Sequence, residues 1–115
     1  MATGYQKGLW AESFAKAYLR FKGYRVLAER FKTPVGEVDL IVKRGRVVVF
    51  VEVKLRGTAA AAAESIHLKN QSRVRRAAEL YLQRYPEYTG LGLRFDALVM
   101  APYAWPRHIQ NAWGE

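Results

Sequence analysis

Three side chains in one apolar stretch of the chain have types and spacing suited to metal-assisted chemistry. Asp39 lies in a first run of β-branched residues, and Glu52 and Lys54 lie in a second. The chain has only two aspartates, so an acid inside its most hydrophobic segment needs a physical reason. Closely packed carboxylates repel one another unless a proton, an arginine or a divalent cation offsets their charge. We therefore expect Asp39 and Glu52 to be metal ligands.

The chemistry of the group favours Mg²⁺, with Mn²⁺ as the alternative. Magnesium prefers oxygen ligands and usually keeps several waters, so one or two carboxylates, a backbone carbonyl and a substrate phosphate suffice. Val53 could supply the carbonyl. Lys54 could hold an attacking water or stabilise charge that develops at phosphorus. These are the components of a phosphodiesterase.

A predicted β-hairpin positions this group. It comprises two strands, Val38–Val42 and Val47–Val53, joined by the basic segment Lys43–Arg46. With Arg44 and Gly45 as the turn, Val42 would lie opposite Val47, Asp39 opposite Phe50, and Glu37 opposite Glu52. One face of the sheet would then carry Glu37, Asp39, Glu52 and Lys54, with Asp39 and Glu52 as diagonal neighbours. The alternative interpretation is a solvated strand face with alternating charges.

The remaining pattern predicts an α/β fold. Helical periodicity covers Tyr5–Lys22 and Leu68–Tyr85, and strand patterns cover Tyr24–Arg30 (an edge strand), Leu93–Met100 and His108–Ala112, with a turn at Thr33, Pro34 and Gly36 and a loop over Gly57–Ala63. The order is one helix, three strands, a second helix and one or two strands. This order indicates a mixed sheet flanked by helices.

Each predicted helix has an apolar face that we expect to be buried. In the first helix the face comprises Leu9, Trp10, Phe14, Ala17, Tyr18 and Phe21. In the second it comprises Val74, Ala77, Ala78, Tyr81 and Leu82, opposite a basic stripe of Lys69, Arg73 and Arg76. We expect Trp10, Trp105 and Trp113 to be core or interface anchors rather than platforms for stacking bases.

Length and composition limit the class of protein. A chain of 115 residues that is 50% hydrophobic is the size of one domain, spanning residues 1–115. The absence of cysteine excludes disulfides, thiolate nucleophiles and cysteine-based metal sites. No apolar run is long enough for a membrane span, and the first residues lack a hydrophobic signal region. We expect a cytoplasmic protein without a membrane partner.

The charge balance points to a polyanion as partner. The net charge is +9, and nucleic acid is the polyanion that fits best, with DNA favoured over RNA. The basic stripe and Arg56 would form a DNA-binding rim, and Gln71 would orient water or contact DNA. The alternatives are solvated helix faces, a charge that serves solubility, or docking on acidic lipid.

The other charged residues have competing interpretations. Glu12 could pair with Lys16 one helical turn away. Glu37 could be a third ligand, but we favour an ion pair with an arginine such as Arg25 or Arg46. We expect Asp96, behind Arg94, to be structural. His67 and His108 lack the spacing of metal ligands, and we expect them to be hydrogen-bonded or exposed rather than general bases.

The hairpin also carries a family resemblance. Gly36–Ile41, followed by Phe50–Lys54 and Arg56, resembles the core of PD-(D/E)xK nucleases, although Pro34 is not in the usual Pro-Asp dipeptide. Nearly the whole chain resembles the YraN-like (UPF0102) family of endonuclease-like proteins, which are similar to archaeal Holliday-junction resolvases. The further matching residues are Gly8, Glu12, Ala15, Lys69, Gln71, Arg94–Asp96, His108, Ile109, Asn111 and Ala112. The alanine run after Gly57 departs from the polar loop that is usual in the family.

The resemblance implies a restriction-endonuclease-like fold, with Asp39 and Glu52 as metal ligands, Lys54 as the catalytic lysine and Glu12 as an accessory acid. We expect a Mg²⁺-dependent endonuclease that hydrolyses phosphodiester bonds, acting on branched DNA if the likeness to resolvases extends that far. The alternative is a non-catalytic nucleic-acid-binding module on the same fold, and a third interpretation is an RNA- or ribosome-associated scaffold. A junction-cutting enzyme needs two active sites, so a C₂ homodimer is an expectation from function.

Overall fold

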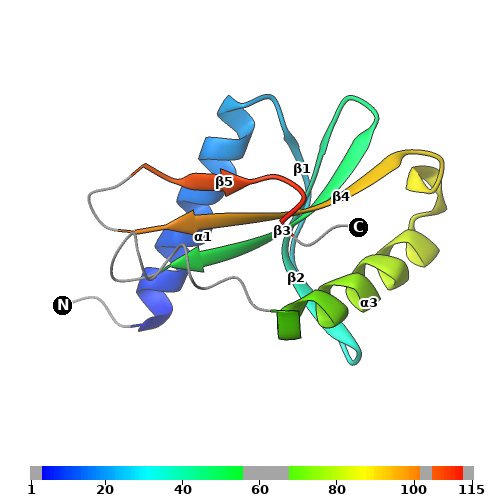
Figure 1. Cartoon of the computed structure of the whole chain (residues 1–115), viewed down its shortest axis with the longest axis horizontal. Coiled ribbons are helices and arrows are strands. Elements are labelled where there is room, and N and C mark those ends of the chain that lie inside the picture. Colours follow the sequence, from blue (N-terminus) through cyan, green and yellow to red (C-terminus); the bar gives the residue numbers. More distant parts are fainter. Residues whose placement is uncertain (1–3, 56–67, 102–104, 113–115) are drawn as a thin grey trace.

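The computed structural model describes residues 4–55, 68–101 and 105–112 (Figure 1). Its elements, in chain order, are α1 (Gly4–Phe21), β1 (Arg25–Thr33), β2 (Gly36–Arg44), β3 (Val47–Leu55), α3 (Leu68–Arg84), the short 3₁₀ helix η1 (Pro86–Tyr88), β4 (Gly92–Met100) and β5 (Arg107–Ile109). Element type and order confirm the prediction of an α/β chain. The predicted loop over Gly57–Ala63 lies outside the described residues, as do His67 and Trp113.

The five strands form one mixed sheet in the order β1-β2-β3-β4-β5. Neighbouring strands are antiparallel except for β3 and β4, which are parallel. A parallel pair needs a long crossover connection, and α3 lies within the connection between β3 and β4. β1 lies at one edge of the sheet, as its charged residues predicted. β5, at the other edge, is shorter than the expected strand and begins one residue earlier.

The helices cover opposite faces of the sheet. On one face, α1 packs on Leu40, Val42, Val49, Val51 and Leu98. On the other, α3 packs on Val38, Ile41, Val48, Phe50 and Ala97. Figure 1 shows the two helices on either side of the strands. Because both faces are covered, the central strands are apolar on both sides, and an acid placed there lies against protein rather than water.

The predicted buried face of α3 is confirmed, whereas that of α1 is wrong at Trp10, Phe14, Ala17 and Phe21 and right at Tyr18, which packs on the core. Val74, Ala77, Ala78 and Tyr81 of α3 are buried. In α1 the buried residues are instead Ala11, Ala15 and Leu19, whereas Trp10, Phe14 and Phe21 are 55%, 40% and 92% exposed. The small alanine side chains allow the helix backbone to lie close to the sheet, so the aromatic side chains point outward.

The tryptophan prediction is also wrong for the core. Trp10 and Trp105 are both exposed, Trp105 by 87%. The ring of Trp10 lies beside that of Phe14 on the same helix face, at a centroid distance of 5.6 Å. The hydrophobicity of its residues alone therefore did not identify the side of α1 that faces the sheet.

Among the described residues, no helix is both long and apolar enough to cross a bilayer.

The β2–β3 hairpin forms as predicted, but with a different register. Arg44 pairs with Val47, so the turn residues are Gly45 and Arg46 rather than Arg44 and Gly45. Gly45 takes a φ of +61°, which favours glycine and fixes the turn one residue later. Val42 consequently pairs with Val49 and not with Val47. This change moves every cross-strand partner by two residues and decides how the acidic side chains meet.

Candidate active site

A cavity of about 290 Å³ opens between the β2–β3 hairpin and α3. Its lining residues are Glu37, Asp39, Glu52, Val53, Lys54 and Arg73. Three carboxylates and two cationic side chains thus surround one space. Five of these residues come from the hairpin that the sequence singled out, and Arg73 comes from α3.

Asp39 lies where the regular β2–β3 ladder ends. The last pair of the ladder is Leu40 with Val51, so Asp39 and Glu52 are the first residues of their strands beyond it. The backbone N–H of Val53 donates a hydrogen bond of 2.7 Å to Asp39 Oδ2. The Asp39 side chain therefore links the two strands beyond the ladder, and the register excludes the predicted pairing of Asp39 with Phe50, which pairs with Ile41 instead.

The surroundings of Asp39 disfavour its charge. Burial is the main cause and raises the pKa of Asp39 to about 6, with smaller increases from the negative charges of Glu52 and Glu12. The Val53 hydrogen bond and the Lys54 ammonium act in the opposite direction on this pKa. A carboxylate in this environment is stabilised by any additional positive charge that enters the cavity.

Glu52 and Lys54 are joined within the same cavity. Lys54 Nζ lies 2.6 Å from Glu52 Oε1, and their side chains are only 17% and 12% exposed. Residues two apart on a strand share a face, and this spacing allows the ion pair. Lys54 is thus held at Glu52, and it directly follows Val53, whose backbone N–H binds Asp39.

The donor set fits a hard divalent cation that retains water. Asp39 and Glu52 offer carboxylate oxygens from adjacent strands, and burial, with a smaller contribution from the charge of Glu52, raises the pKa of Asp39. Within the described ranges, no group of three or more His, Cys, Asp or Glu side chains has the arrangement of a metal site. Mg²⁺ needs only one or two carboxylates from the protein, with waters and phosphate completing the shell. The residues present therefore fit Mg²⁺ better than a metal that requires a full protein cage.

Glu12 does not pair with Lys16. Its Oε2 lies 2.5 Å from Arg30 Nε, and Lys16 instead bonds Glu29 at 2.8 Å. Arg30 occupies the β1 position opposite Asp39, between the pairs Glu29–Leu40 and Phe31–Val38. Glu12 and Lys16 of α1 thus pair with residues of β1 instead of with each other, because β1 places an opposite charge beside each of them. Glu12 thereby lies close enough for its charge to act on Asp39.

The predicted partners of Glu37 are also wrong. β1 pairs Lys32 with Glu37 and Arg25 with Lys43, so Arg25 lies at the far end of the strand. Arg46 lies in the turn at that same end. Strand residues rise by about 3.3 Å each, so neither arginine is within reach of Glu37. Glu37 is exposed and lines the cavity instead.

The structure brings one residue of the predicted DNA-binding set into the cavity. Arg73 is among the lining residues, whereas Gln71 and Arg76 lie elsewhere on α3, half-buried and exposed respectively. Lys69 is in α3, but its side chain lies outside the described part of the structure, as does all of Arg56. Their roles stay predictions.

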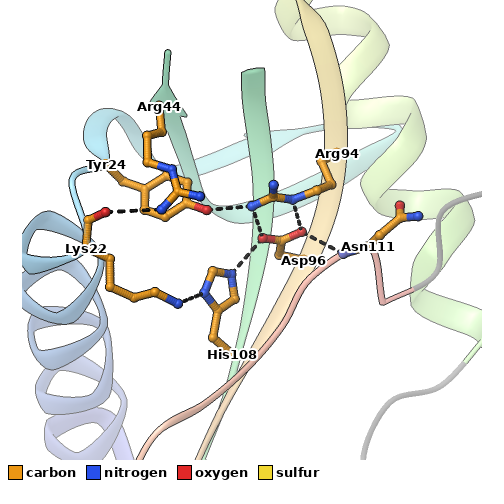
Figure 2. Close-up of polar contacts among 7 residues, drawn as sticks. All are labelled: Lys22, Tyr24, Arg44, Arg94, Asp96, His108 and Asn111. Atoms are coloured by element: carbon orange, nitrogen blue, oxygen red, sulfur yellow. Dashed lines mark hydrogen bonds and ion pairs between the residues drawn. The ribbon is translucent and has the colours of Figure 1, made fainter. Parts of the chain in front are cut away.

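Asp96 lies on the other face of the sheet and is fully buried. Three groups bind it through four hydrogen bonds: the Arg94 guanidinium at 2.8 and 2.9 Å, His108 Nε2 at 2.7 Å, and the backbone N–H of Asn111 at 2.8 Å. Figure 2 shows these donors converging on the carboxylate. Burial pushes the pKa of Asp96 upward, but the hydrogen bonds from His108 and Arg94 outweigh burial and hold this pKa below its usual range.

The same cluster continues to the end of α1. His108 Nδ1 lies 2.6 Å from Lys22 Nζ, and Arg94 donates a 2.6 Å bond to the hydroxyl of Tyr24. Because Asp96 only accepts and the Lys22 ammonium only donates, a neutral His108 with its proton on Nε2 satisfies both contacts. Burial, followed by the nearby charge of Arg44, lowers the pKa of Lys22. Asp96 and His108 thus link β4, β5 and α1, which agrees with the structural interpretation of Asp96 and the hydrogen-bonded one of His108.

The sequence interpretation missed Lys22, Tyr24 and Arg44 in this cluster. Arg44 Nη1 donates to the Lys22 carbonyl at 3.2 Å, and its guanidinium stacks on the Tyr24 ring at 4.5 Å. The available signal was Gly23, which ends α1 with a φ of +93°. A cationic side chain near such a helix end is a typical partner for its last carbonyl groups.

Comparisons with known proteins agree in pointing to a single family. Residues 11–100 match a family described as "Uncharacterised protein family UPF0102". A UPF0102 protein of Parvibaculum lavamentivorans is 52% identical over 97% of this chain and 86% of its own length. UPF0102 proteins of Chelativorans and Methylorubrum extorquens are 48% and 51% identical, covering 95% and 93% of this chain and 88% and 84% of their own lengths.

Proposed function

The chain belongs to the UPF0102 family, as the resemblance of its hairpin and helices predicted. On that premise we propose that it is a Mg²⁺-dependent endonuclease-like protein that hydrolyses phosphodiester bonds in DNA. The observation that supports this most is the cavity in which Asp39, Glu52 and Lys54 meet. Membership of the family by itself implies no reaction, so the proposal depends on the chemistry of these side chains.

The charge environment of Asp39 supports a bound cation. Asp39 and Glu52 line one cavity from neighbouring strands, and burial, together with the negative charge of Glu52, makes ionisation of Asp39 costly, as its pKa of about 6 indicates. A divalent cation would remove this cost through direct coordination by Asp39 and Glu52. It would supply Lewis-acid chemistry, neutralising charge on a phosphate oxygen and making water a better nucleophile.

Lys54 would act from the same strand face. Its ammonium is held at the cavity by Glu52 and can orient water or stabilise the charge that develops on the phosphate oxygens. In the net reaction a water oxygen bonds to phosphorus and the bond from phosphorus to one sugar oxygen breaks. The departing oxygen keeps the electron pair and takes up a proton. The products are a phosphomonoester and an alcohol.

A polyanionic substrate agrees with the charge of the chain. The net charge of +9 favours attraction to a phosphate backbone, and α3 contributes Arg73 at the cavity and the exposed Arg76 outside it. DNA is therefore the proposed substrate class, with branched DNA as the form that the resemblance suggested. A C₂ dimer would be needed to cut both strands of a junction, and sedimentation of the full chain would test it.

The proposal is tested by metal binding and cleavage in matched variants. Mn²⁺ titrated into the wild-type protein should bind saturably, and Asp39→Asn and Glu52→Gln should each abolish binding. Incubation with duplex, single-stranded and four-way-junction DNA in Mg²⁺ should give products that disappear in Lys54→Ala. Glu79→Gln removes an exposed carboxylate of α3 and should change neither result. Metal binding that persists in both acid variants would contradict the proposed centre.

A second candidate is a nucleic-acid-binding module without catalysis. One observation favours it: Lys54 lies 2.6 Å from Glu52, so part of the carboxylate charge is already balanced within the protein. In this version the basic surface would bind DNA and the cavity would hold a structural ion or none. DNA binding by wild type without cleavage in either Mg²⁺ or Mn²⁺ would favour this candidate.

A further inference from the structure

Arg73 differs from the other described arginines of α3 in what its guanidinium faces. Arg75 stacks on the Phe95 ring at 4.8 Å and Arg84 on the Phe31 ring at 5.5 Å, so these two cover apolar surface. Arg76 is exposed and lies outside the cavity lining. Arg73 alone among these four lines the cavity that contains Asp39, Glu52 and Lys54.

Within the described residues, the Arg73 guanidinium is exposed and has no polar partner. No hydrogen bond or ion pair joins it to another residue in the described part of the chain, although three carboxylates line the same cavity. Lys54, the other cation there, is bonded to Glu52. A long cationic side chain beside acids that does not bind them is suited to an anion that enters from outside.

The charge of the cavity makes anion binding conditional on a cation. Glu37, Asp39 and Glu52 with Lys54 and Arg73 leave one net negative charge when all five are ionised. A divalent cation at the carboxylates would change this to one net positive charge. A phosphodiester carries a single negative charge and would then be electrostatically matched to the cavity.

The backbone that carries Arg73 is fixed against the hairpin. Gly36, at the start of β2, lies so close to α3 that a Cβ atom at this position would come within 1.8 Å of the Arg73 carbonyl oxygen. This contact sets the height of one turn of α3 above the strand that carries Asp39. Because this contact fixes the backbone at Arg73, it also fixes the point from which the side chain reaches the cavity. The planar guanidinium can donate two parallel hydrogen bonds to a phosphate.

We propose that Arg73 is the phosphate-binding residue of this cavity, with its guanidinium donating to the non-bridging oxygens of the phosphodiester that is held beside the cation. This inference rests on the proposed function and assigns Arg73 to the reacting phosphate rather than to general contact with the DNA backbone. Arg73 keeps its proton throughout, and the bonds that form and break are those of the hydrolysis described above.

The test separates binding of one phosphodiester from cleavage of DNA. The probe for binding is the dinucleotide thymidylyl-thymidine, added to the full chain with Ca²⁺ in place of Mg²⁺ and followed by NMR. Cleavage of a short DNA substrate in Mg²⁺ supplies kcat and KM. The variants are Arg73→Gln, Arg73→Lys and, as a control on the same helix with the same loss of charge, Arg84→Gln.

Arg73→Gln should abolish cation-dependent binding of the dinucleotide and lower kcat by about 100-fold or more, the size typical of losing one donor to developing charge. Arg73→Lys should recover part of both, because it restores the charge without the bidentate fork. Arg84→Gln should match wild type in both measurements. Mn²⁺ affinity should be retained in Arg73→Gln, since Arg73 is not a ligand.

The outcomes distinguish this inference from the proposed function. Normal cleavage and dinucleotide binding by Arg73→Gln would overturn the role of Arg73 and leave the nuclease proposal standing. Dinucleotide binding that depends on Ca²⁺ and Arg73, in a wild-type protein that cleaves nothing, would support the phosphate site and contradict hydrolysis. A wild-type protein that neither binds the dinucleotide nor cleaves DNA would overturn both.

Discussion

Asp39 Oδ2 accepts the backbone N–H of Val53 at 2.7 Å, just beyond the point where the β2–β3 ladder ends. The side chain of one strand thus takes the place of a backbone partner for the next. This bond holds the Asp39 carboxylate against β3, at the residue that follows Glu52. It also explains how a half-buried aspartate is tolerated in an otherwise apolar hairpin.

The raised pKa of Asp39 predicts how stability depends on pH in the metal-free protein. A carboxyl whose folded-state pKa lies near 6, above the model-peptide value of 3.8, favours its neutral form in the folded state. The stabilisation of the folded state by the neutral Asp39 carboxyl is therefore present at low pH, and it is lost as pH rises from about 4 to about 6. Asp39→Asn keeps an acceptor for the Val53 amide and removes this loss, so it should stabilise the protein at pH 8 by about 1–3 kcal/mol.

Urea unfolding in the presence of a chelator, at pH 4 and pH 8, checks this prediction. The gain from Asp39→Asn should be large at pH 8 and small at pH 4. Glu79→Gln, on the exposed face of α3, serves as the control and should show little difference between the two conditions. If Asp39→Asn were less stable than wild type at pH 8, the fold would not disfavour the ionised carboxylate, and the prediction would be wrong.

Gly36→Ala should disrupt the contact between β2 and α3. The added methyl group would meet backbone atoms of Arg73, the nearest at 1.8 Å, and backbone cannot move aside as a side chain can. We expect a loss of about 1–3 kcal/mol in the free energy of unfolding, typical of overpacking. Gly90→Ala is the matched control, because no atom lies within 4 Å of a Cβ at that position. Equal stability of the two variants, measured by urea unfolding, would contradict the close packing.

Asp96→Asn should be strongly destabilising because it leaves buried donors without their charged partner. Asp96 is fully buried and bonded to Arg94 and His108. Breaking a buried pair from one side typically costs about 3–5 kcal/mol. Glu29→Gln breaks the more exposed pair with Lys16 and should cost about 0–1 kcal/mol. Thermal unfolding of both variants at neutral pH would reveal the difference, and similar melting temperatures would argue against a structural role for the cluster.

Arg76→Gln should weaken DNA binding through the phosphate backbone. Arg76 is exposed on the helix that carries Arg73 but lies outside the cavity lining. Loss of one phosphate contact should reduce the slope of log affinity against log salt by about 0.9. Fluorescence anisotropy with labelled duplex DNA between low and moderate salt measures this slope. An unchanged slope would remove Arg76 from the proposed DNA-binding rim.

The sequence by itself determined the order of elements and the residues of the hairpin. The runs of β-branched residues in β2 and β3, and the apolar face of α3, are local patterns, and both predicted the structure correctly. The alternation of side chains along each strand grouped Asp39, Glu52 and Lys54. Family membership followed from motifs distributed over nearly the whole chain.

Tertiary structure alone decided which charges meet. The register of the hairpin depended on the left-handed conformation of Gly45, which paired Phe50 with Ile41 rather than with Asp39. Glu12 paired with Arg30 because β1 runs beside α1. The residues of α1 that pack on the sheet are Ala11 and Ala15, whereas its aromatic residues Trp10, Phe14 and Phe21 are exposed. Arg73 entered the cavity because Gly36 lets α3 approach β2. These relationships join segments distant in the chain, and local residue patterns carry no information about such contacts.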